Sequence, residues 1–220
     1  MCIRDSAWCA AVYFTGRGSA VIHFLDRCKP ITTERLYLRS WTVEDMQGYI
    51  LFGTDPDVMI PAGLKPARTA AEAREGLRRS VNTPWGFAIT LRSTDEIIGQ
   101  IKYQDDLTRS YVESLSVAFE LAKCHWGCGY MTEALRAVVR NAFEEYDVDL
   151  LVAAHFKGNE RSKRVIERAG FLFDGYSVCG FRRFDGALLD CVNYSLLREE
   201  YELSLIHISE AHETVLDLVC

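Results

Sequence analysis

Alternating hydrophobic and polar positions in the middle of the chain predict a strand, and a change of period then predicts a helix. Over residues 115–121 the apolar side chains occupy every second position, which is the period of a β-strand. From Met131 to Phe143 they recur every three or four residues, as on an amphipathic helix with one buried face. Gly127 and Gly129 lie between these two segments. The pattern therefore predicts a strand, a glycine turn and a helix in succession.

Patterns on either side extend this unit into an α/β (α+β) fold with one mixed sheet. Strands are expected near 36–38, 85–91, 97–103, 112–121, 150–154, 171–181 and 188–196, and helices over about 43–53, 70–81, 131–143 and 162–169. The run 150–154 is apolar throughout, which favours a strand buried on both faces in a parallel pair.

Turn and capping signals mark where several of these elements start and stop. Asp185-Gly186 predicts a hairpin turn between the last two strands. Segments 42–45 and 69–72 have the form of capping boxes and would open the first two helices. The segment between those helices is expected to be mobile and to face the substrate. Gly170 is expected to end the helix that starts near Ser162.

One domain accounts for residues 31–203, and the two ends do not follow its pattern. Residues 1–6 and 204–210 resemble translated sequencing-adapter fragments. We therefore expect 1–30 to be a non-native or disordered extension and 204–220 to be a non-native tail, and we leave both out of the functional argument.

Composition narrows the classes of function. The chain has 220 residues, of which 49% are hydrophobic and 25% charged, with a net charge of −6. A chain of this length can bury a substantial core. The negative charge argues against a nucleic-acid partner, whose binding face is usually basic. No apolar run approaches the roughly 20 residues that would span a bilayer. We expect a cytoplasmic protein.

The eight cysteines do not form a metal motif. Cys124, His125 and Cys128 are the one group to consider for zinc, but they stand too close together for tetrahedral ligation and no fourth ligand is nearby. Free thiols, buried or half-buried, in a reducing compartment are the expectation. No metal is predicted.

The glycine turn predicts an anion site. A helix that begins directly after two glycines presents free N–H groups and the positive end of its dipole, a combination that commonly binds phosphate. A dinucleotide fold would need a third glycine after the first strand, and a mononucleotide loop would need Gly-Lys-Ser/Thr. Neither is present, so the ligand is some other phosphate-bearing molecule.

Four ordered motifs resemble the GNAT acetyltransferase superfamily, within it the RimJ/RimL branch of ribosomal-protein N-terminal acetylases. The motifs are residues 33–39, 126–134, 159–171 and 193–201, and together they span nearly all of 31–203. The resemblance implies a single domain with a mostly antiparallel sheet, a splayed parallel strand pair and flanking helices. It also implies an acyltransferase that uses acetyl-CoA as co-substrate.

The resemblance assigns residues to the cofactor. Backbone N–H groups of the turn would hold the diphosphate of acetyl-CoA, and the splayed strands would receive the pantetheine arm. The residues expected at the cofactor are Val117, Phe119, Trp126, Gly127, Cys128, Gly129, Tyr130, Met131, Thr132, Asn159 and Ser162. Met131 is bulkier than the small residue usual in the family at its position.

Catalytic residues are less well marked. The resemblance makes Asn159 a pantetheine contact and Ser162 a donor to the departing thiol, although Asn159 is also suited to cap a helix. Many relatives carry a glutamate where this chain has Ser116, so the base is open. The carboxylates available are those of Asp106, Glu113, Glu120 and Asp190, with His155 on the neighbouring strand. A solvated edge charge is the alternative for Glu120, a structural role for His155 and a structural salt bridge for Asp190. A base is not needed if the amine arrives uncharged.

The acceptor would be a primary amine, either a protein N-terminus or a small molecule, attacking the thioester directly. A catalytically silent domain that senses acyl-CoA is the alternative from another class, supported by the missing glutamate and by Met131. A binding module for another nucleotide is a third possibility. Either a monomer or a homodimer is compatible with the sequence.

Overall fold

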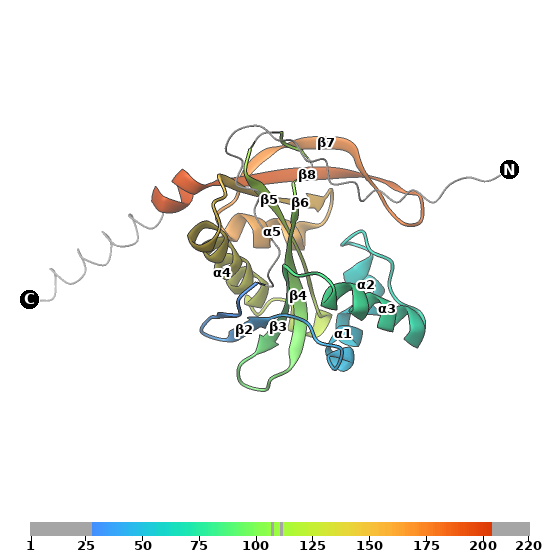
Figure 1. Cartoon of the computed structure of the whole chain (residues 1–220). Helices are drawn as coiled ribbons and strands as arrows, with labels where there is room; N and C mark the ends of the chain where they lie inside the picture. Colours follow the sequence, from blue (N-terminus) through green and yellow to red (C-terminus); the bar gives the residue numbers. More distant parts are fainter. Residues whose placement is uncertain (1–27, 107, 111, 204–220) are drawn as a thin grey trace, which may run out of the picture.

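A single eight-stranded sheet forms the centre of the computed structural model, which describes residues 28–106, 108–110 and 112–203 (Figure 1). The strands are β1 (Ile31–Thr32), β2 (Leu36–Arg39), β3 (Gly86–Leu91), β4 (Ile97–Asp105), β5 (Ser114–Leu121), β6 (Leu150–Phe156), β7 (Leu172–Arg182) and β8 (Leu188–Leu197). The helices are α1 (Met46–Gly53), α2 (Pro56–Met59), α3 (Ala70–Val81), α4 (Tyr130–Glu145) and α5 (Glu160–Arg168), with a short 3₁₀ turn η1 (Lys123–His125). The strand order is β1-β2-β3-β4-β5-β6-β8-β7.

The middle of the sheet contains a parallel pair that separates at one end. Strands β5 and β6 are parallel, and every other neighbouring pair in the sheet is antiparallel. Pairing between β5 and β6 runs from Ser114↔Leu150 to Val117↔Ala153 and stops there. Since β5 continues to Leu121 and β6 to Phe156, their last residues are unpaired with each other. The expected splayed pair and the mixed α/β fold are confirmed.

Two hydrophobic clusters fill the two faces of the sheet. The larger cluster lies beneath α4 and α5 and includes Leu135, Leu151 and Ile166, none of which is exposed. The smaller cluster lies beneath α1, α2 and α3 around Trp41 and Phe52. Figure 1 shows α1–α3 gathered on one side of β3 and β4, with α4 on the other. The apolar stripe that the sequence period predicted on α4 thus faces the sheet.

The helix starts show where capping signals succeed and where they fail. Helix α3 begins as predicted, because the Thr69 hydroxyl accepts a hydrogen bond from the N–H of Glu72 over 3.1 Å. The prediction for the first helix is wrong by three residues, since α1 starts at Met46. The N–H of Thr42 donates to the carboxylate of Asp45, as in the predicted capping box, but that carboxylate also binds Arg39, and Asp45 itself is the N-cap.

The remaining elements follow the predictions with two additions. Gly186 has φ +88° in the turn between β7 and β8, which confirms the hairpin, and Gly170 has φ +100° just after α5. The two-residue strand β1 and the helix α2 were not predicted. Cys28, which the sequence assigned to the extension, is 5% exposed and donates its N–H to Pro84. Lys29 and Pro30 of the predicted extension are also described, and Lys29 pairs with Glu145 over 2.9 Å; the rest of both predicted end segments, 1–27 and 204–220, lies outside the described residues.

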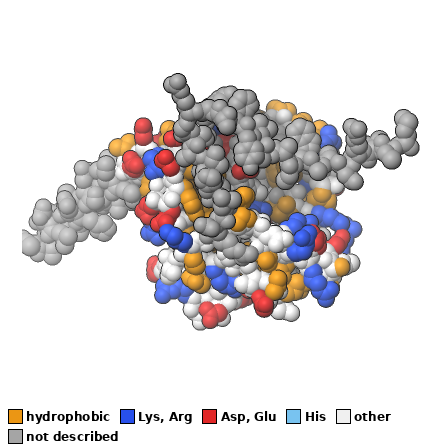
Figure 2. Space-filling view, in the orientation of Figure 1, with side chains coloured by type: hydrophobic (Ala, Val, Ile, Leu, Met, Phe, Trp, Pro, Cys, Tyr) orange, Lys and Arg blue, Asp and Glu red, His pale blue; other side chains and the backbone are white. Residues whose placement is uncertain are grey.

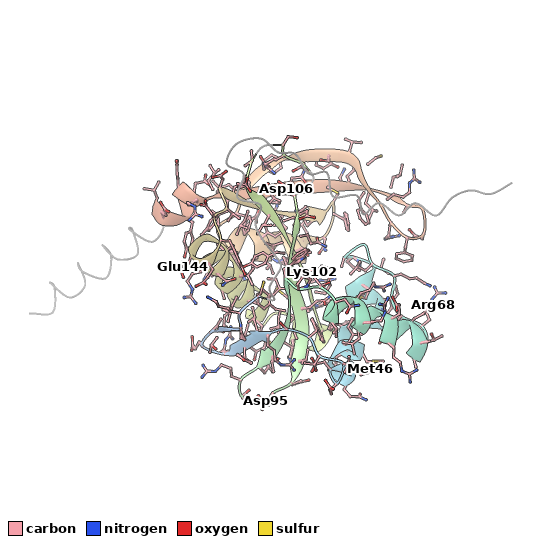
Figure 3. The ribbon with its side chains drawn as sticks, in the orientation of Figure 1. Met46, Arg68, Asp95, Lys102, Asp106 and Glu144 are labelled. Atoms are coloured by element: carbon pink, nitrogen blue, oxygen red, sulfur yellow. The ribbon has the colours of Figure 1, made fainter. Side chains whose placement is uncertain are left out.

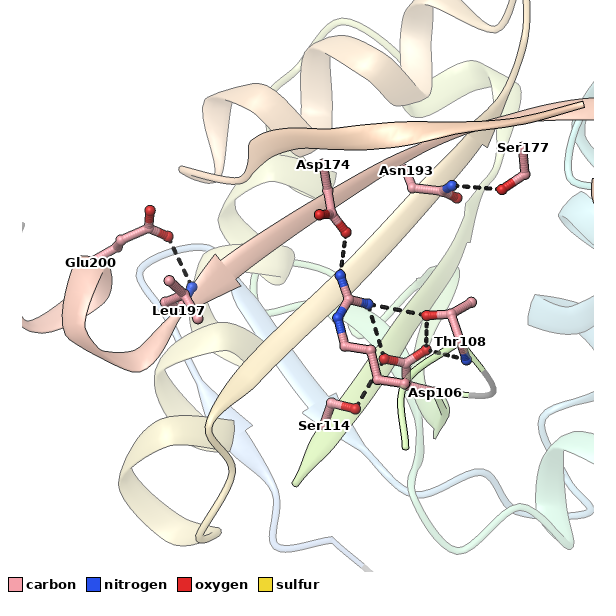
Figure 4. A network of polar contacts seen from close by, with 9 residues as sticks. Asp106, Thr108, Ser114, Asp174, Ser177, Asn193, Leu197 and Glu200 are labelled. Atoms are coloured by element: carbon pink, nitrogen blue, oxygen red, sulfur yellow. Dashed lines mark hydrogen bonds and ion pairs between the residues drawn. The ribbon is translucent and has the colours of Figure 1, made fainter. Parts of the chain in front are cut away.

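At the end of β4 far from the glycine turn, an ionic network fixes the connection to β5. In Figure 3, Asp95 marks the β3–β4 turn at one end of the sheet and Asp106 the opposite end of β4. Asp106 accepts hydrogen bonds from Ser114 and Arg109, and Arg109 reaches Asp174 on β7 (Figure 4). Burial acts to raise the pKa of Asp106, but its hydrogen bonds, above all those from Thr108, outweigh burial and lower it. Asp106 therefore has a structural role.

The surface visible in Figure 2 carries acidic and basic side chains of both signs among apolar ones. No helix among the described residues has the length and apolar character needed to cross a membrane. Of the five cysteines in the described chain, all free, only Cys28 is buried; Cys124, Cys128 and Cys179 are exposed, so the expectation of buried or half-buried thiols was wrong for these three.

Candidate active site

The glycine turn adopts the conformation that the sequence predicted. Gly127 has φ +81° and Gly129 φ +80°, and helix α4 starts directly afterwards at Tyr130. These backbone angles strain any residue with a Cβ, which explains why both positions are glycine. Within the described chain, the N–H groups of residues 127–132 have no hydrogen-bond acceptor, and the N-cap Gly129 has no side chain to supply one. Six amides are therefore available at the positive end of α4.

A groove of about 190 Å³ leads from this turn toward the separated ends of β5 and β6. Its walls come from five places: the end of β5, the segment from η1 through the glycine turn, the start of α4, helix α5 with the residue before it, and the segment around α2. Of the predicted cofactor residues, those lining it are Phe119, Trp126, Gly127, Gly129, Tyr130, Met131, Thr132, Asn159 and Ser162. Val117 occupies the last paired position of β5 and is buried in the larger cluster, and Cys128 lies outside the lining.

Trp126 forms a fixed wall of the groove. Its indole N–H donates to the carbonyl of Leu121 over 2.9 Å. The guanidinium of Arg161 stacks on the indole ring, 4.0 Å from its centroid. Arg164 and Arg168 line the same groove one and two turns further along α5. This side of the groove is therefore positive, which suits a ligand with several phosphates.

Two carboxylates line the groove: that of Asp57, which pairs with Lys123, and that of the buried Glu120. The side chain of Glu120 points to the α1–α3 side of the sheet, where Gln100 donates to its carboxylate over 2.7 Å and accepts in turn from Ser80 on α3 over 3.0 Å. The residue is 5% exposed yet lines the groove, and no cation pairs with it among the described residues. The alternative of a solvated edge charge is wrong, because β5 turns this position inward beneath α3.

His155 lies away from the groove. It is 6% exposed; its Nδ1 is 2.9 Å from the carbonyl oxygen of Phe156 and its Nε2 is 3.4 Å from the hydroxyl of Tyr194. It lines neither the groove nor the neighbouring hollow beside β6 and α5. The structure thus brings Glu120 and Ser162 to one groove and leaves His155 packed against β8.

Asn159 combines two tasks at the start of α5. Its side-chain oxygen accepts the N–H of Ser162 over 3.3 Å, which caps the helix, and its side-chain nitrogen donates to the carbonyl of Pro61 over 3.3 Å. The second bond connects α5 to the segment after α2 across the groove. The predicted capping role of Asn159 is confirmed, and its contact with a ligand stays a prediction.

We expected the segment between the first two predicted helices to face the substrate, but no residue of it was named for this wall of the groove. Asp57, Val58, Pro61 and Ala62 line the groove from α2 and the turn that follows. Val58 and Met59 of the segment are buried in the smaller cluster, so the segment also contributes to the core. Helix α2 has four residues, too few for a hydrophobic period to reveal it. A usable signal was present in Asp55-Pro56, since the Asp55 side chain caps α2 by accepting the N–H of Asp57 and Pro56 occupies the first helical position.

Comparison with known proteins agrees with the fold. Residues 35–172 match the family model described as an acetyltransferase (GNAT) domain. The uncharacterized N-acetyltransferase p20 of Bacillus licheniformis is 25% identical over 177 residues, covering 77% of this chain and 96% of that protein.

Solved structures with the same fold include two acetyltransferases that are named for their substrates. The ribosomal-protein-S5-alanine acetyltransferase of Vibrio fischeri is 20% identical with a TM-score of 0.62, over 78% of this chain and 97% of that one. The spermidine N-acetyltransferase of Vibrio cholerae, solved with CoA and spermine, is 16% identical with a TM-score of 0.63, over 77% and 99%. At these identities the likeness establishes the fold alone.

Proposed function

The chain belongs to the GNAT acetyltransferase family, and from this we propose that it moves the acetyl group of acetyl-CoA to a primary amine, with the glycine turn holding the diphosphate. The observation that carries the proposal is the row of six amides at residues 127–132, which have no acceptor within the described chain and stand beside a groove that reaches the end of β5 beyond its pairing with β6. A diphosphate accepts hydrogen bonds and carries negative charge, so it suits amides at a helix N-terminus.

The two ends of the groove suit the two ends of the cofactor. Arg161, Arg164 and Arg168 surround the phosphate end with positive charge. Beyond Val117, strand β5 remains paired with β4 but no longer with β6, so the backbone groups on its β6 side are left without a strand partner. An N–H there can polarise the thioester carbonyl. Acetyl-CoA supplies an activated acetyl group: the new N–C bond forms as the C–S bond breaks, and the coenzyme leaves as a thiol.

Glu120 and Ser162 are the side chains placed to handle protons. The buried carboxylate of Glu120 has no partner cation in the part of the chain that the structure describes, and burying an unpaired charge is costly. An ammonium group entering from the α1–α3 side would pair with it and lose its proton to it, which leaves a neutral amine to attack. The hydroxyl of Ser162 lines the groove and can donate to the departing sulfur. His155 has no part in this scheme.

The acceptor follows from the family only in class. A RimJ/RimL-like enzyme would acetylate a protein N-terminus, whereas the spermidine N-acetyltransferase of the same fold acts on a small polyamine. Both acceptors are cationic amines, and both would meet Glu120. The cytoplasm, where acetyl-CoA and free thiols coexist, is the proposed compartment.

Two substitutions at one position separate charge from backbone strain. Gly129→Ala and Gly129→Glu impose the same penalty for φ +80°, but only the glutamate adds a negative charge beside the amides. We expect Gly129→Ala to weaken CoA binding and Gly129→Glu to abolish it in calorimetry. Equal CoA affinities for wild type and Gly129→Glu would show that the diphosphate does not bind at this turn. Thiol release with acetyl-CoA and a panel of amines then tests turnover, and binding without turnover on any amine would favour the silent sensor.

A further inference from the structure

We propose that Arg35, in the turn between β1 and β2, is a positioning residue that holds the glycine turn in shape and neutralises Glu133 so that the helix end stays attractive to a diphosphate. The inference rests on the proposed function. Arg35 lies more than 90 residues before the turn in the chain and does not line the groove.

A single guanidinium connects three parts of the cradle. Its Nε donates to a carboxylate oxygen of Glu133 over 2.6 Å, and its Nη1 donates to the carbonyl of Cys128 over 3.0 Å. The same group stacks on Tyr130, 4.6 Å from the ring centroid. Arg35 thus contacts the middle of the glycine turn, the first residue of α4 and the first turn of that helix.

Glu133 is bound from the same side by two further donors. The hydroxyl of Thr33 donates to its other carboxylate oxygen over 2.6 Å, and the backbone N–H of Arg35 donates to that oxygen over 2.9 Å. Arg92 in turn donates to the carbonyls of Thr33 and Glu34, which fixes the β1–β2 turn. These contacts of Thr33 and Arg35 with Glu133, which we call the clasp, are therefore anchored to the sheet and do not depend on a flexible side chain alone.

The turn has little else to hold it. A Cβ on Gly127 would meet no atom within 4 Å, and one on Gly129 would meet only the Nη2 of Arg35, at 3.5 Å. Cys128 is exposed. Because the glycine turn lacks packing, its two left-handed residues would exchange among conformations without an external tie. Among the described residues, the hydrogen bond from Arg35 to the carbonyl of Cys128 is the one that ties residues 127–129 to a side chain from a distant part of the chain.

Charge gives the second half of the argument. A carboxylate in the first turn stabilises a helix, but at an anion site it repels the ligand. Glu133 stands there with its side chain 18% exposed, so water screens it poorly. Arg35 supplies the compensating positive charge. The pair leaves the N-terminus of α4 with its own dipole and its free amides to attract a diphosphate.

Four variants test the clasp, with CoA as the probe. Arg35→Gln removes the charge and the fork; we expect the Kd for CoA and the KM for acetyl-CoA to rise about tenfold or more, with kcat at saturation and the KM for the amine unchanged. Arg35→Lys keeps the charge but cannot bind Glu133 and Cys128 together, so its Kd for CoA should fall between those of wild type and Arg35→Gln. Arg74→Gln on α3, an exposed arginine far from the groove, is the matched control and should bind as wild type.

The double variant Arg35→Gln/Glu133→Gln separates charge from shape. Removing the uncompensated carboxylate should recover part of the lost affinity, and a merely structural role for Arg35 would give no recovery. The N–H of Glu133 donates to the carbonyl of Gly129, so hydrogen exchange of this amide should speed up in Arg35→Gln and stay fast at residue 133 of the double variant. Wild-type affinity in Arg35→Gln would overturn the inference. If Arg35→Gln does not fold, wild-type affinity for CoA in Arg35→Lys would overturn the inference in the same way. Failure of wild type itself to bind CoA would instead overturn the proposed function.

Discussion

The side-chain amide of Gln100 donates to the carboxylate of Glu120 over 2.7 Å, beneath helix α3 and out of contact with bulk water. Gln100 is neutral, so this bond satisfies one carboxylate oxygen without cancelling the charge. Ser80 fixes the orientation of Gln100 by donating to its other side-chain atom. The arrangement holds a carboxylate at the wall of the groove that has no partner cation among the described residues, where an incoming ammonium group can pair with it.

Glu120→Gln should lower kcat without changing CoA affinity. The substitution keeps the shape of the side chain and removes the group that pairs with the ammonium and accepts its proton, for which general-base catalysis is worth about 10²–10⁴-fold. Steady-state kinetics with the best amine and calorimetry with CoA measure the two effects. Glu44→Gln, at an exposed position, is the control and should leave both unchanged. An unaltered kcat in Glu120→Gln would mean that water or another group, and not Glu120, accepts the proton of the ammonium.

Gly127→Ala and Gly186→Ala should separate binding from stability. Both glycines have positive φ, and a Cβ would meet nothing within 4 Å at either, so the expected strain is about 1–2 kcal/mol in each case. Gly127 belongs to the amide cradle, whereas Gly186 belongs to the β7–β8 hairpin. We expect both variants to melt earlier by similar amounts and only Gly127→Ala to lose affinity for CoA. Equal CoA affinity in the two variants would contradict a role for the turn.

Glu133 should make stability depend on pH in the acid range. Burial acts to raise the pKa of its carboxyl, but the bonds from Thr33 and Arg35 outweigh burial and hold the pKa below its ordinary value. Stabilisation from a depressed pKa is complete above the unfolded value of about 4.3 and is lost as pH falls through the folded value. Glu133→Gln should therefore unfold more easily than wild type at pH 7, by roughly 1 kcal/mol given the half-exposed arginine.

The comparison across pH contains its own control. Chemical unfolding of wild type and Glu133→Gln at several pH values should show the gap between them closing below about pH 4.3, because protonation removes the charge that the variant lacks. A gap that stays constant down to pH 3 would mean that Glu133 stabilises the fold through shape and not through its charge.

Tyr103→Phe should destabilise the packing of α4 on the sheet. The buried hydroxyl of Tyr103 donates to the carbonyl of Val138 over 2.7 Å and lies 3.0 Å from the side-chain oxygen of Asn141. Loss of this hydroxyl should cost about 1 kcal/mol in the free energy of unfolding. Tyr37→Phe, on a ring that is 37% exposed, should change it by less than about 0.5 kcal/mol. Equal effects would show that the bond to α4 adds no stability.

The hydrophobic period predicted the long elements well and the short ones poorly. Helices α3 and α4 and strands β3 to β8 extend over enough residues for a period to be recognised. Helix α2 and strand β1 have four and two residues, and tertiary contacts define them. The start of α1 was misplaced because Arg39, from the preceding strand, captures the carboxylate of Asp45, which is a competition that local sequence rules do not include.

For the candidate site, the sequence by itself determined the glycine turn, because positive φ and free helix N–H groups are local properties of glycine and of a helix start. It could not decide between Glu120 and His155, since each is a polar residue in a strand with the same local pattern. The tertiary structure decided which of the two lines the groove, and it brought Arg35 against Glu133 from nearly 100 residues away. Contacts between distant segments depend on how the sheet folds back on itself, and no local period encodes them.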